Sequence, residues 1–143
     1  MALLPLPWTA LQLAEAIEIR DAAGRVLSYS YFDDDYTRRG QNHRLTLVDA
    51  WLYAGWVVAT PAWHQGAPRD PAVRLGPIAP PFDAFHASGG IAVRDFRGQE
   101  LGLTYIDHPR LPPARRIGER EAVAFVRWVI STPRRFPPPA TGT

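Results

Sequence analysis

Apolar and polar residues alternate along a short segment near the start of the chain, and this alternation predicts a β-strand. Residues 17–20 run Ile-Glu-Ile-Arg, which is the period of two that half-buried strands show. The next residues, Asp21-Ala-Ala-Gly24, carry the aspartate and glycine that suit a type I turn closed by a left-handed glycine. We expect the return strand to have a core face and a half-solvated face. The predicted core face carries Leu27, Tyr29 and Tyr31. The predicted half-solvated face carries Ser28, Ser30 and Phe32.

Farther along, the apolar spacing changes to that of a helix. One stripe of residues is predicted to face the core: Ala50, Ala54, Val57 and Val58. Thr46 is suited to cap this helix, with Asp49 three residues later as the acid of a capping box. We expect the helix to end at Thr60-Pro61, because a proline has no N–H for the helical ladder.

This whole pattern occurs twice, with an offset of 74 residues. Residues 7–33 share nine identities with residues 81–107, where ordinary residue usage would give roughly two by chance. The turn residues recur as Asp95 and Gly98, and the second helix ends at the same Thr-Pro pair. Its predicted core stripe is Ala122, Val126, Val129 and Ile130. The pattern indicates a tandem duplication.

The duplication predicts an α+β fold. We expect two ββα repeats that form a four-stranded antiparallel sheet with two helices on one face, related by a pseudo-two-fold axis. One repeat alone would bury too little apolar surface to be stable. The predicted organisation is a first repeat over 7–61, a linker over 62–80, a second repeat over 81–133 and a proline-rich tail over 134–143.

The first repeat resembles a group of short alphaproteobacterial proteins of unknown function. The resemblance rests on the segment 17–35, with its Asp-x-x-Gly turn and Tyr-x-Tyr-Phe strand, and on the helix before Pro61. The second repeat departs from this pattern, because it has Leu-Thr-Tyr-Ile at 103–106 and no acidic run after it. The resemblance implies fold and lineage. It implies no activity and no catalytic residue.

Composition narrows the function classes. The chain of 143 residues has no cysteine, which excludes a disulfide framework, a thiolate zinc site and a cysteine nucleophile. No apolar run is long enough to span a bilayer, and the first residues do not have the features of a signal peptide. We therefore expect a cytoplasmic protein with no cofactor. All 16 basic residues are arginine, yet the net charge is only +2, so nucleic-acid binding is allowed without being strongly indicated.

Two clusters of arginine occupy equivalent loops. They are Arg38, Arg39, Arg44 and Arg115, Arg116, Arg120. Placed around a pseudo-dyad, they can straddle a nucleic-acid backbone, with Tyr36 nearby for stacking. The alternative is that these arginines only neutralise the neighbouring acids, Asp33–Asp35 in one loop and Glu119 with Glu121 in the other.

Catalytic and metal-binding patterns are weak. Asp33–Asp35 with His43, and Asp107 with His108 in the second repeat, are metal-ligand types, but only Asp33 and Asp107 match between the repeats. The segment Ser88-Gly-Gly90 lacks the pattern of a nucleophile elbow or a phosphate loop. We assign no metal site and no catalytic residue, and an enzyme or metal-binding protein stays an unfavoured alternative.

The first helix is apolar on more than its core stripe. It carries Trp51, Leu52 and Trp56, and it has Val48 and Gly55 where the second helix has arginine at 120 and 127. Such a helix is either covered within the chain, by Trp63 of the linker or by Trp8, or it binds a partner. We therefore predict a non-catalytic protein–protein interaction or scaffolding module, or a self-associating one, with Trp51, Leu52 and Trp56 as the partner-binding residues.

Overall fold

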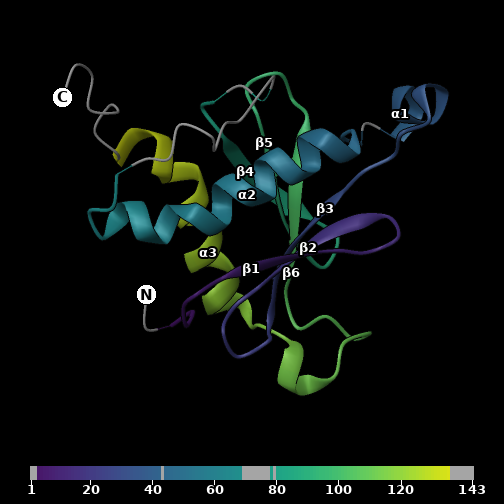
Figure 1. The fold of residues 1–143 in the computed structure, drawn as a ribbon. Coiled ribbons are helices and arrows are strands. Elements are labelled where there is room, and N and C mark those ends of the chain that lie inside the picture. The colour runs from purple at the N-terminus through teal and green to yellow at the C-terminus, as the bar shows by residue number, and fades with distance from the viewer. Residues whose placement is uncertain (1–2, 43, 69–77, 79, 136–143) are drawn as a thin grey trace, which may run out of the picture.

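The computed structural model describes residues 3–42, 44–68, 78 and 80–135 of the chain. Among these residues the chain forms one six-stranded antiparallel sheet, three α-helices and a short 3-10 helix (Figure 1). The elements are β1 (Thr9–Gln12), β2 (Ala16–Arg20), β3 (Val26–Tyr31), α1 (Tyr36–Asn42), α2 (Leu47–His64), β4 (Asp83–Ala87), β5 (Gly90–Arg94), β6 (Glu100–Tyr105), η1 (Pro113–Arg115) and α3 (Glu119–Arg135).

The α+β class was predicted, but the four-stranded sheet with two ββα repeats is wrong. Each half supplies three strands, in the order β1-β2-β3-β6-β5-β4, and α1 adds a helix in a segment taken for a loop. The missed strands, β1 and β4, are the two edges. An edge strand pairs on one side only, and three of the four β1 residues are exposed. Such an edge strand therefore lacks the alternation of apolar and polar residues by which a strand is recognised in a sequence.

The strands of the two halves pair in the same register. Ile17 pairs with Ser30, and Ile91 pairs with Thr104 at positions 74 residues later. At the centre of the sheet, Tyr29 of β3 pairs with Leu103 of β6, which is its own counterpart. A pseudo-two-fold axis therefore passes between β3 and β6 at this pair.

The predicted turns are confirmed in both halves. Gly24 and Gly98 have φ angles of 84° and 83°, in the region that glycine adopts without a steric penalty. In each turn the aspartate accepts two backbone N–H groups at 2.9 Å, from Ala23 and Arg25 in the first half and from Arg97 and Gln99 in the second. The same short motif therefore forms the same turn twice.

The predicted core face of the return strand is correct for Leu27 but wrong for Tyr29, which lies in a second cluster on the opposite face. The register shifts between Ile19 and Arg20, and Leu27 is the extra residue of a β-bulge in β3. Such an extra residue breaks the alternation of side chains, so Leu27 and Tyr29 face opposite sides of the sheet. Small residues complete the helix side: a Cβ on Gly102 would lie 3.2 Å from Tyr53 Cε2.

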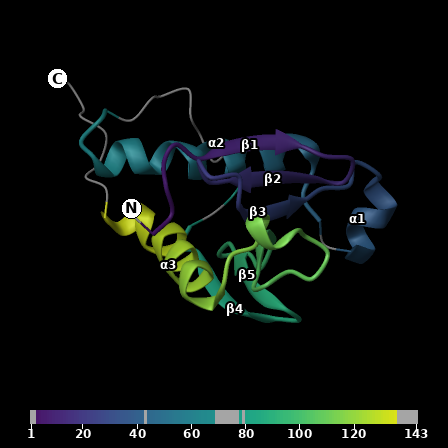
Figure 2. The same cartoon turned by 90° about the horizontal axis from the view of Figure 1, so that it is seen from below.

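The aromatic residue that precedes the first strand of each half packs on the long helix of the other half. We call this the exchange of leading aromatic residues. Trp8, which precedes β1, packs on α3 of the second half, with ring centroids 5.4 Å from Phe125. Its counterpart Phe82, which precedes β4, packs on α2 of the first half, 5.4 Å from Trp56. A single hydrophobic core therefore includes residues of both helices and of both halves of the sheet. Figure 2 shows α2 beside β1, β2 and β3, and α3 beside β4 and β5.

Both helices continue past the prolines at which they were expected to end. α2 runs through Pro61 to His64, and α3 runs to Arg135. Pro61 deprives the Val57 carbonyl of its helical N–H donor, but the Thr60 hydroxyl donates to that carbonyl at 2.8 Å. The Thr-Pro pair therefore replaces the lost hydrogen bond instead of ending the helix. Neither helix, nor any other in the described part of the chain, is long and apolar enough to cross a membrane.

Candidate functional site

The outward faces of the two long helices differ in charge. On α3 this face is amphipathic, with Glu119, Arg120, Val123, Ala124 and Arg127 exposed or half-buried. On α2 the corresponding stripe is Val48, Trp51, Leu52, Gly55, Ala59 and Ala62. Val48 is 67% exposed and Trp51 is 38% exposed. The α2 stripe, which we call the neutral helix face, therefore presents apolar surface to solvent where α3 presents charge.

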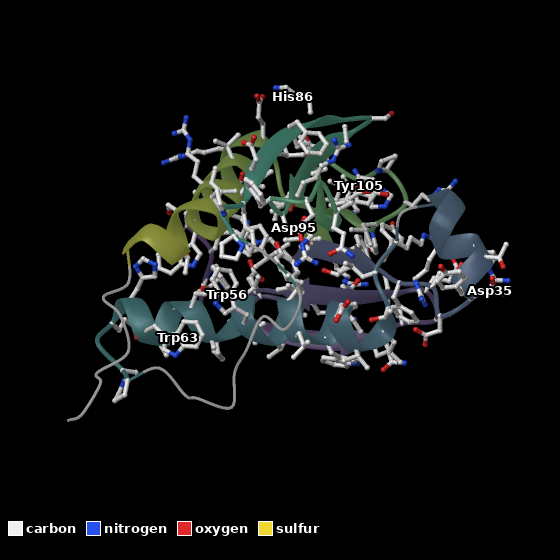
Figure 3. The ribbon with its side chains drawn as sticks, turned by 90° about the horizontal axis from the view of Figure 1, so that it is seen from above. Asp35, Trp56, Trp63, His86, Asp95 and Tyr105 are labelled. Carbon is white, nitrogen blue, oxygen red and sulfur yellow. The ribbon has the colours of Figure 1, made fainter. Side chains whose placement is uncertain are left out.

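The three residues predicted to bind a partner have different environments. The Trp51 indole lies at the surface, where its N–H donates to the Gln12 side chain at 3.0 Å. Leu52 is half-buried beside it. Trp56 points from α2 into the interior, is 1% exposed and packs on Phe82 (Figure 3). The neutral helix face therefore contains Trp51 and Leu52, whereas Trp56 supports it from within.

Neither tryptophan that was considered as an internal cover lies on the neutral helix face. Trp63 belongs to the end of α2 itself and packs on Trp56 with ring centroids 6.4 Å apart. Trp8 packs on α3. Among the described residues, therefore, neither side chain shields Val48 or Trp51.

The edge strand β1 adjoins this face. Trp51 reaches β1 through Gln12, and all four β1 residues are uncharged. Leu11 is 44% exposed and Leu13, just past the strand, is 38% exposed. The other edge, β4, instead exposes Asp83 and His86, and Figure 3 shows His86 at the outer margin of the sheet. Natural sheets usually protect their edges with charge, so β1 is the edge suited to pairing.

The contribution of β1 does not follow from the hydrophobic pattern. Leu11 and Leu13 have no periodic pattern around them, so the sequence predicts a strand only from Ile17 onward. The available signal was the repeat itself, because residues 9–12 lie inside the segment that matches 81–107.

The first predicted arginine cluster is held within its own loop. Arg38 forms a two-pronged contact with the Asp33 carboxylate at 2.8 and 3.0 Å, and this carboxylate raises the pKa of Arg38. Arg39 donates to the Asp33 carbonyl at 3.1 Å. The Arg44 guanidinium lies 5.2 Å from the centre of the Tyr31 ring. The loop therefore orders these three side chains against its own backbone and the end of β3.

The second cluster differs from the first. Arg115 donates to both oxygens of the buried Glu18 carboxylate, at 3.2 and 3.1 Å. Arg116 donates to the Leu111 carbonyl at 2.7 Å, and Arg120 is exposed on α3. Because β3 and β6 are antiparallel, the two loops leave opposite ends of the central strand pair (Figure 1). The six arginines therefore do not form one continuous strip.

The open face of the sheet holds an aromatic cluster near the pseudo-two-fold axis. The hydroxyl groups of Tyr31 and Tyr105 lie 3.1 Å apart, and His108 stacks on Tyr105 with centroids 4.2 Å apart. Burial, followed by the charge of Glu18, raises the pKa of Tyr29 to about 12. Burial, followed by the charges of Arg110 and Arg116, lowers the pKa of His108. Both shifts favour the uncharged form of the side chain, so Tyr29 and His108 suit packing rather than proton transfer.

The acids of the first loop act as local caps. Asp34 accepts the backbone N–H of Leu47 at 3.0 Å, and Asp35 accepts that of Arg38 at 2.9 Å. His43 lies outside the described residues, and Asp107 with His108 lies at the other end of the sheet. Within the described ranges, no three histidine or acidic side chains gather into a group able to hold a metal ion. Ser88 lies in the β4–β5 turn, next to Gly89 with a φ of 74°.

No protein-family model, curated protein or solved structure matches this chain. The resemblance of residues 17–35 to a group of alphaproteobacterial proteins therefore stays a prediction, as does the duplication. Function has to be inferred from the surfaces described above.

Proposed function

We propose that this protein is a non-catalytic interaction module that pairs with a second copy of itself through β1 and the neutral helix face. The observation that carries the proposal is the difference between the two helices. α3 keeps arginine at 120 and 127, whereas α2 has Val48 and Gly55 at the corresponding positions. An apolar helix face beside an unprotected edge strand is typical of an interaction surface.

A second copy fits this surface better than an unrelated chain, because the surface is self-complementary. A two-fold axis beside β1 would bring edge against edge and helix against helix. Since neither β1 nor the neutral helix face carries charge, no like charges would meet across that axis. The internal junction has the same design: β3 pairs with β6, while Trp128 of α3 donates to Thr60 of α2 at 2.7 Å.

Energetics favour an interface that uses both features. Burying one large apolar side chain contributes roughly 1.5–3 kcal/mol, whereas association costs an estimated 4–15 kcal/mol. Val48 or Trp51 alone would therefore not suffice. Two copies of each, together with new β1 hydrogen bonds, can exceed the cost.

The test restores the charges that α2 lacks. The double variant Val48→Arg/Gly55→Arg places on α2 the residues found at the same positions of α3. A Cβ on Gly55 meets nothing within 4 Å, and arginine is a better helix former than glycine, so the fold should persist. Sedimentation velocity over a wide range of protein concentration should show a dimer for the wild type and a monomer for this variant.

Arg120→Val is the matched control on α3 and should leave the dimer intact. A wild-type protein that stays monomeric at every concentration would refute pairing with a second copy and would favour a different protein as the partner. A cytoplasmic location stays a prediction from the sequence.

A further inference from the structure

The hydrogen bond that closes the hairpin of β1 and β2 determines which backbone groups of β1 are free. Leu13 donates its N–H to the Ala16 carbonyl at 2.7 Å, so these two residues form a hydrogen-bonded pair. In an antiparallel ladder such pairs alternate with pairs that exchange no hydrogen bond. By the register of β1 with β2, Leu11 is therefore bonded to β2. Its neighbours Ala10 and Gln12 direct their N–H and C=O groups away from the sheet.

The opposite edge of the sheet is capped at the matching position. By the same alternation Ala84, the counterpart of Ala10, directs its N–H outward from β4. That N–H donates to the Asp83 carboxylate at 2.9 Å. Thr9 replaces this aspartate in the first half and makes no such bond to Ala10 within the described part of the chain. β1 therefore offers hydrogen-bonding groups at a place where β4 protects its own edge.

We propose that β1 pairs antiparallel with β1 of a second copy and that Leu11 lies on the two-fold axis; this inference rests on the dimer of the proposed function. The register places Ala10 of each copy opposite Gln12 of the other. Both residues face outward, so each such pair exchanges two hydrogen bonds. Leu11 then faces its own counterpart in the non-hydrogen-bonded position between them, where opposite side chains lie closest.

The other two-fold registers leave outward-facing groups without a partner. An axis at Ala10 would require Trp8 to pair with Gln12, but Trp8 precedes the strand and its ring packs on α3. An axis at Gln12 would require Ala14 to pair with Ala10, but Ala14 lies in the turn between β1 and β2. Each of these registers keeps only the hydrogen-bonded pair on the axis itself. An axis at Leu11 forms two such pairs.

The exposed leucines of the first half suit this register. Leu11 is 44% exposed, and Leu13, just past the strand, is 38% exposed. Leu11 lies on the open face of the sheet, because it pairs with Glu18 and Glu18 pairs with Tyr29 of that face. In the proposed register Leu11 meets Leu11 and Leu13 meets Thr9. Association would therefore cover both leucines without placing a charged side chain opposite another.

On the helix side, the same register joins β1 to the neutral helix face. The Trp51 indole donates to the Gln12 side chain at 3.0 Å, so the ring lies beside the end of β1. Ala10 of the second copy would lie opposite Gln12, where its small side chain leaves room for the indole. Trp51 would then contact the strands of both copies. Because β4 is capped, the assembly should end at two copies instead of extending into a filament.

Crosslinking tests the register directly, because the chain has no cysteine of its own. Under mild oxidation, Leu11→Cys should give a disulfide-linked dimer on a non-reducing gel. Residues of a non-hydrogen-bonded pair have Cα atoms about 4.5 Å apart, which a disulfide can span.

Thr9→Cys is the matched control, since it places a thiol at an exposed position of the same face. The Thr9 residues of the two copies would lie more than about 7 Å apart, too far for a disulfide. A mixture of the Thr9→Cys and Leu13→Cys proteins should crosslink, whereas neither protein should crosslink alone.

Hydrogen exchange of the wild type, followed for each residue by NMR, tests the same pairing without a substitution. The amides of Ala10 and Gln12 should exchange more slowly, by about tenfold or more, once the protein is concentrated enough to dimerise. The amide of Leu11 is bonded to β2 in either state and should change much less.

The possible failures have different meanings. Crosslinking of Ala10→Cys or Gln12→Cys alone, with none for Leu11→Cys, would overturn the register. A dimer in which the Ala10 and Gln12 amides exchange as in the monomer would overturn strand pairing and leave pairing through the neutral helix face intact. A wild type that stays monomeric at every concentration would instead refute the proposed function itself.

Discussion

The two halves of this molecule share a backbone but not a surface. Their strand registers and their turn glycines coincide at an offset of 74 residues. By contrast, the residue equivalent to Glu18 is Ala92, and the charged outer face of α3 corresponds to the neutral helix face of α2. The turn positions have kept their residue types, whereas the buried position of Glu18 and the outer faces of the two long helices have not. The differences between the halves are therefore where function is best sought.

The largest expected effect comes from separating the halves. Because Trp8 packs on α3 and Phe82 packs on α2, neither half contains its own complete core. A chain cut within residues 69–77 should give two fragments that are unfolded alone and that fold when mixed. Circular dichroism checks this. A fragment that unfolds cooperatively by itself would show that the exchange of aromatic residues is dispensable.

Trp8→Ala and Phe82→Ala sharpen the comparison at single positions. Each removes a buried aromatic ring that joins the two halves, so each should lower the free energy of unfolding by about 3–5 kcal/mol. Urea denaturation measures both, and Phe96→Ala, at an exposed ring of the same half as Phe82, is the control. A loss confined to one of the two variants would show that the exchange is unequal.

The turns provide a smaller and more symmetric test. Gly24→Val and Gly98→Val should each destabilise by about 1 kcal/mol or more, since a β-branched residue tolerates a positive φ poorly. A Cβ at either position meets nothing within 4 Å, so any loss reports backbone strain alone. Gly55→Ala, in a helix, should instead stabilise by about 0.5–1 kcal/mol. Unchanged thermal unfolding of both valine variants would contradict the turn assignment.

The smallest effect concerns pH. The pKa of His108 is lowered from its usual value of 6.5, chiefly by burial, so the unfolded chain takes up this proton at a higher pH than the folded protein does. Stability should therefore be complete above pH 6.5 and fall as the pH drops below it. A proton NMR titration gives the pKa directly, and His108→Gln should remove this part of the pH dependence. A pKa above 6.5 would exclude the stacked, uncharged arrangement on Tyr105.

These results show which features the sequence could predict. The hairpin of β2 and β3 and its repetition follow from local chemistry, because Asp21 and Gly24 determine a turn by themselves. The bulge at Leu27 could not be foreseen, since it depends on how two strands fit together, and it places Tyr29 on the face opposite Leu27. The continuation of α2 through Pro61 could not be foreseen either, because it depends on the hydrogen bond that the Thr60 hydroxyl donates.

The candidate sites were predictable to a similar degree. The apolar surface of α2 follows from its helical spacing, although the same spacing could not show that Trp56 points inward. A cleft lined by Arg39, Arg44 and Arg97 could not be predicted, because Arg97 lies in a turn of one half and Arg39 in the short helix α1 of the other. Nothing in the spacing of 39 and 97 along the chain indicates that they face one space.

The exchange of leading aromatic residues has a consequence for how this protein can change over time. In a homodimer of identical chains, every substitution appears twice, so a new binding surface on one subunit alters the other as well. Here both halves belong to one polypeptide, and the covalent connection keeps their effective concentration high. The two halves therefore do not need to have identical sequences. The first half, for example, has Glu18 as the partner of Arg115, whereas the second half has Ala92 at the position that matches Glu18. Even on the axis the counterparts are free to differ: Tyr31 and Tyr105 are both tyrosine and their hydroxyl groups meet, whereas Tyr29 pairs with Leu103.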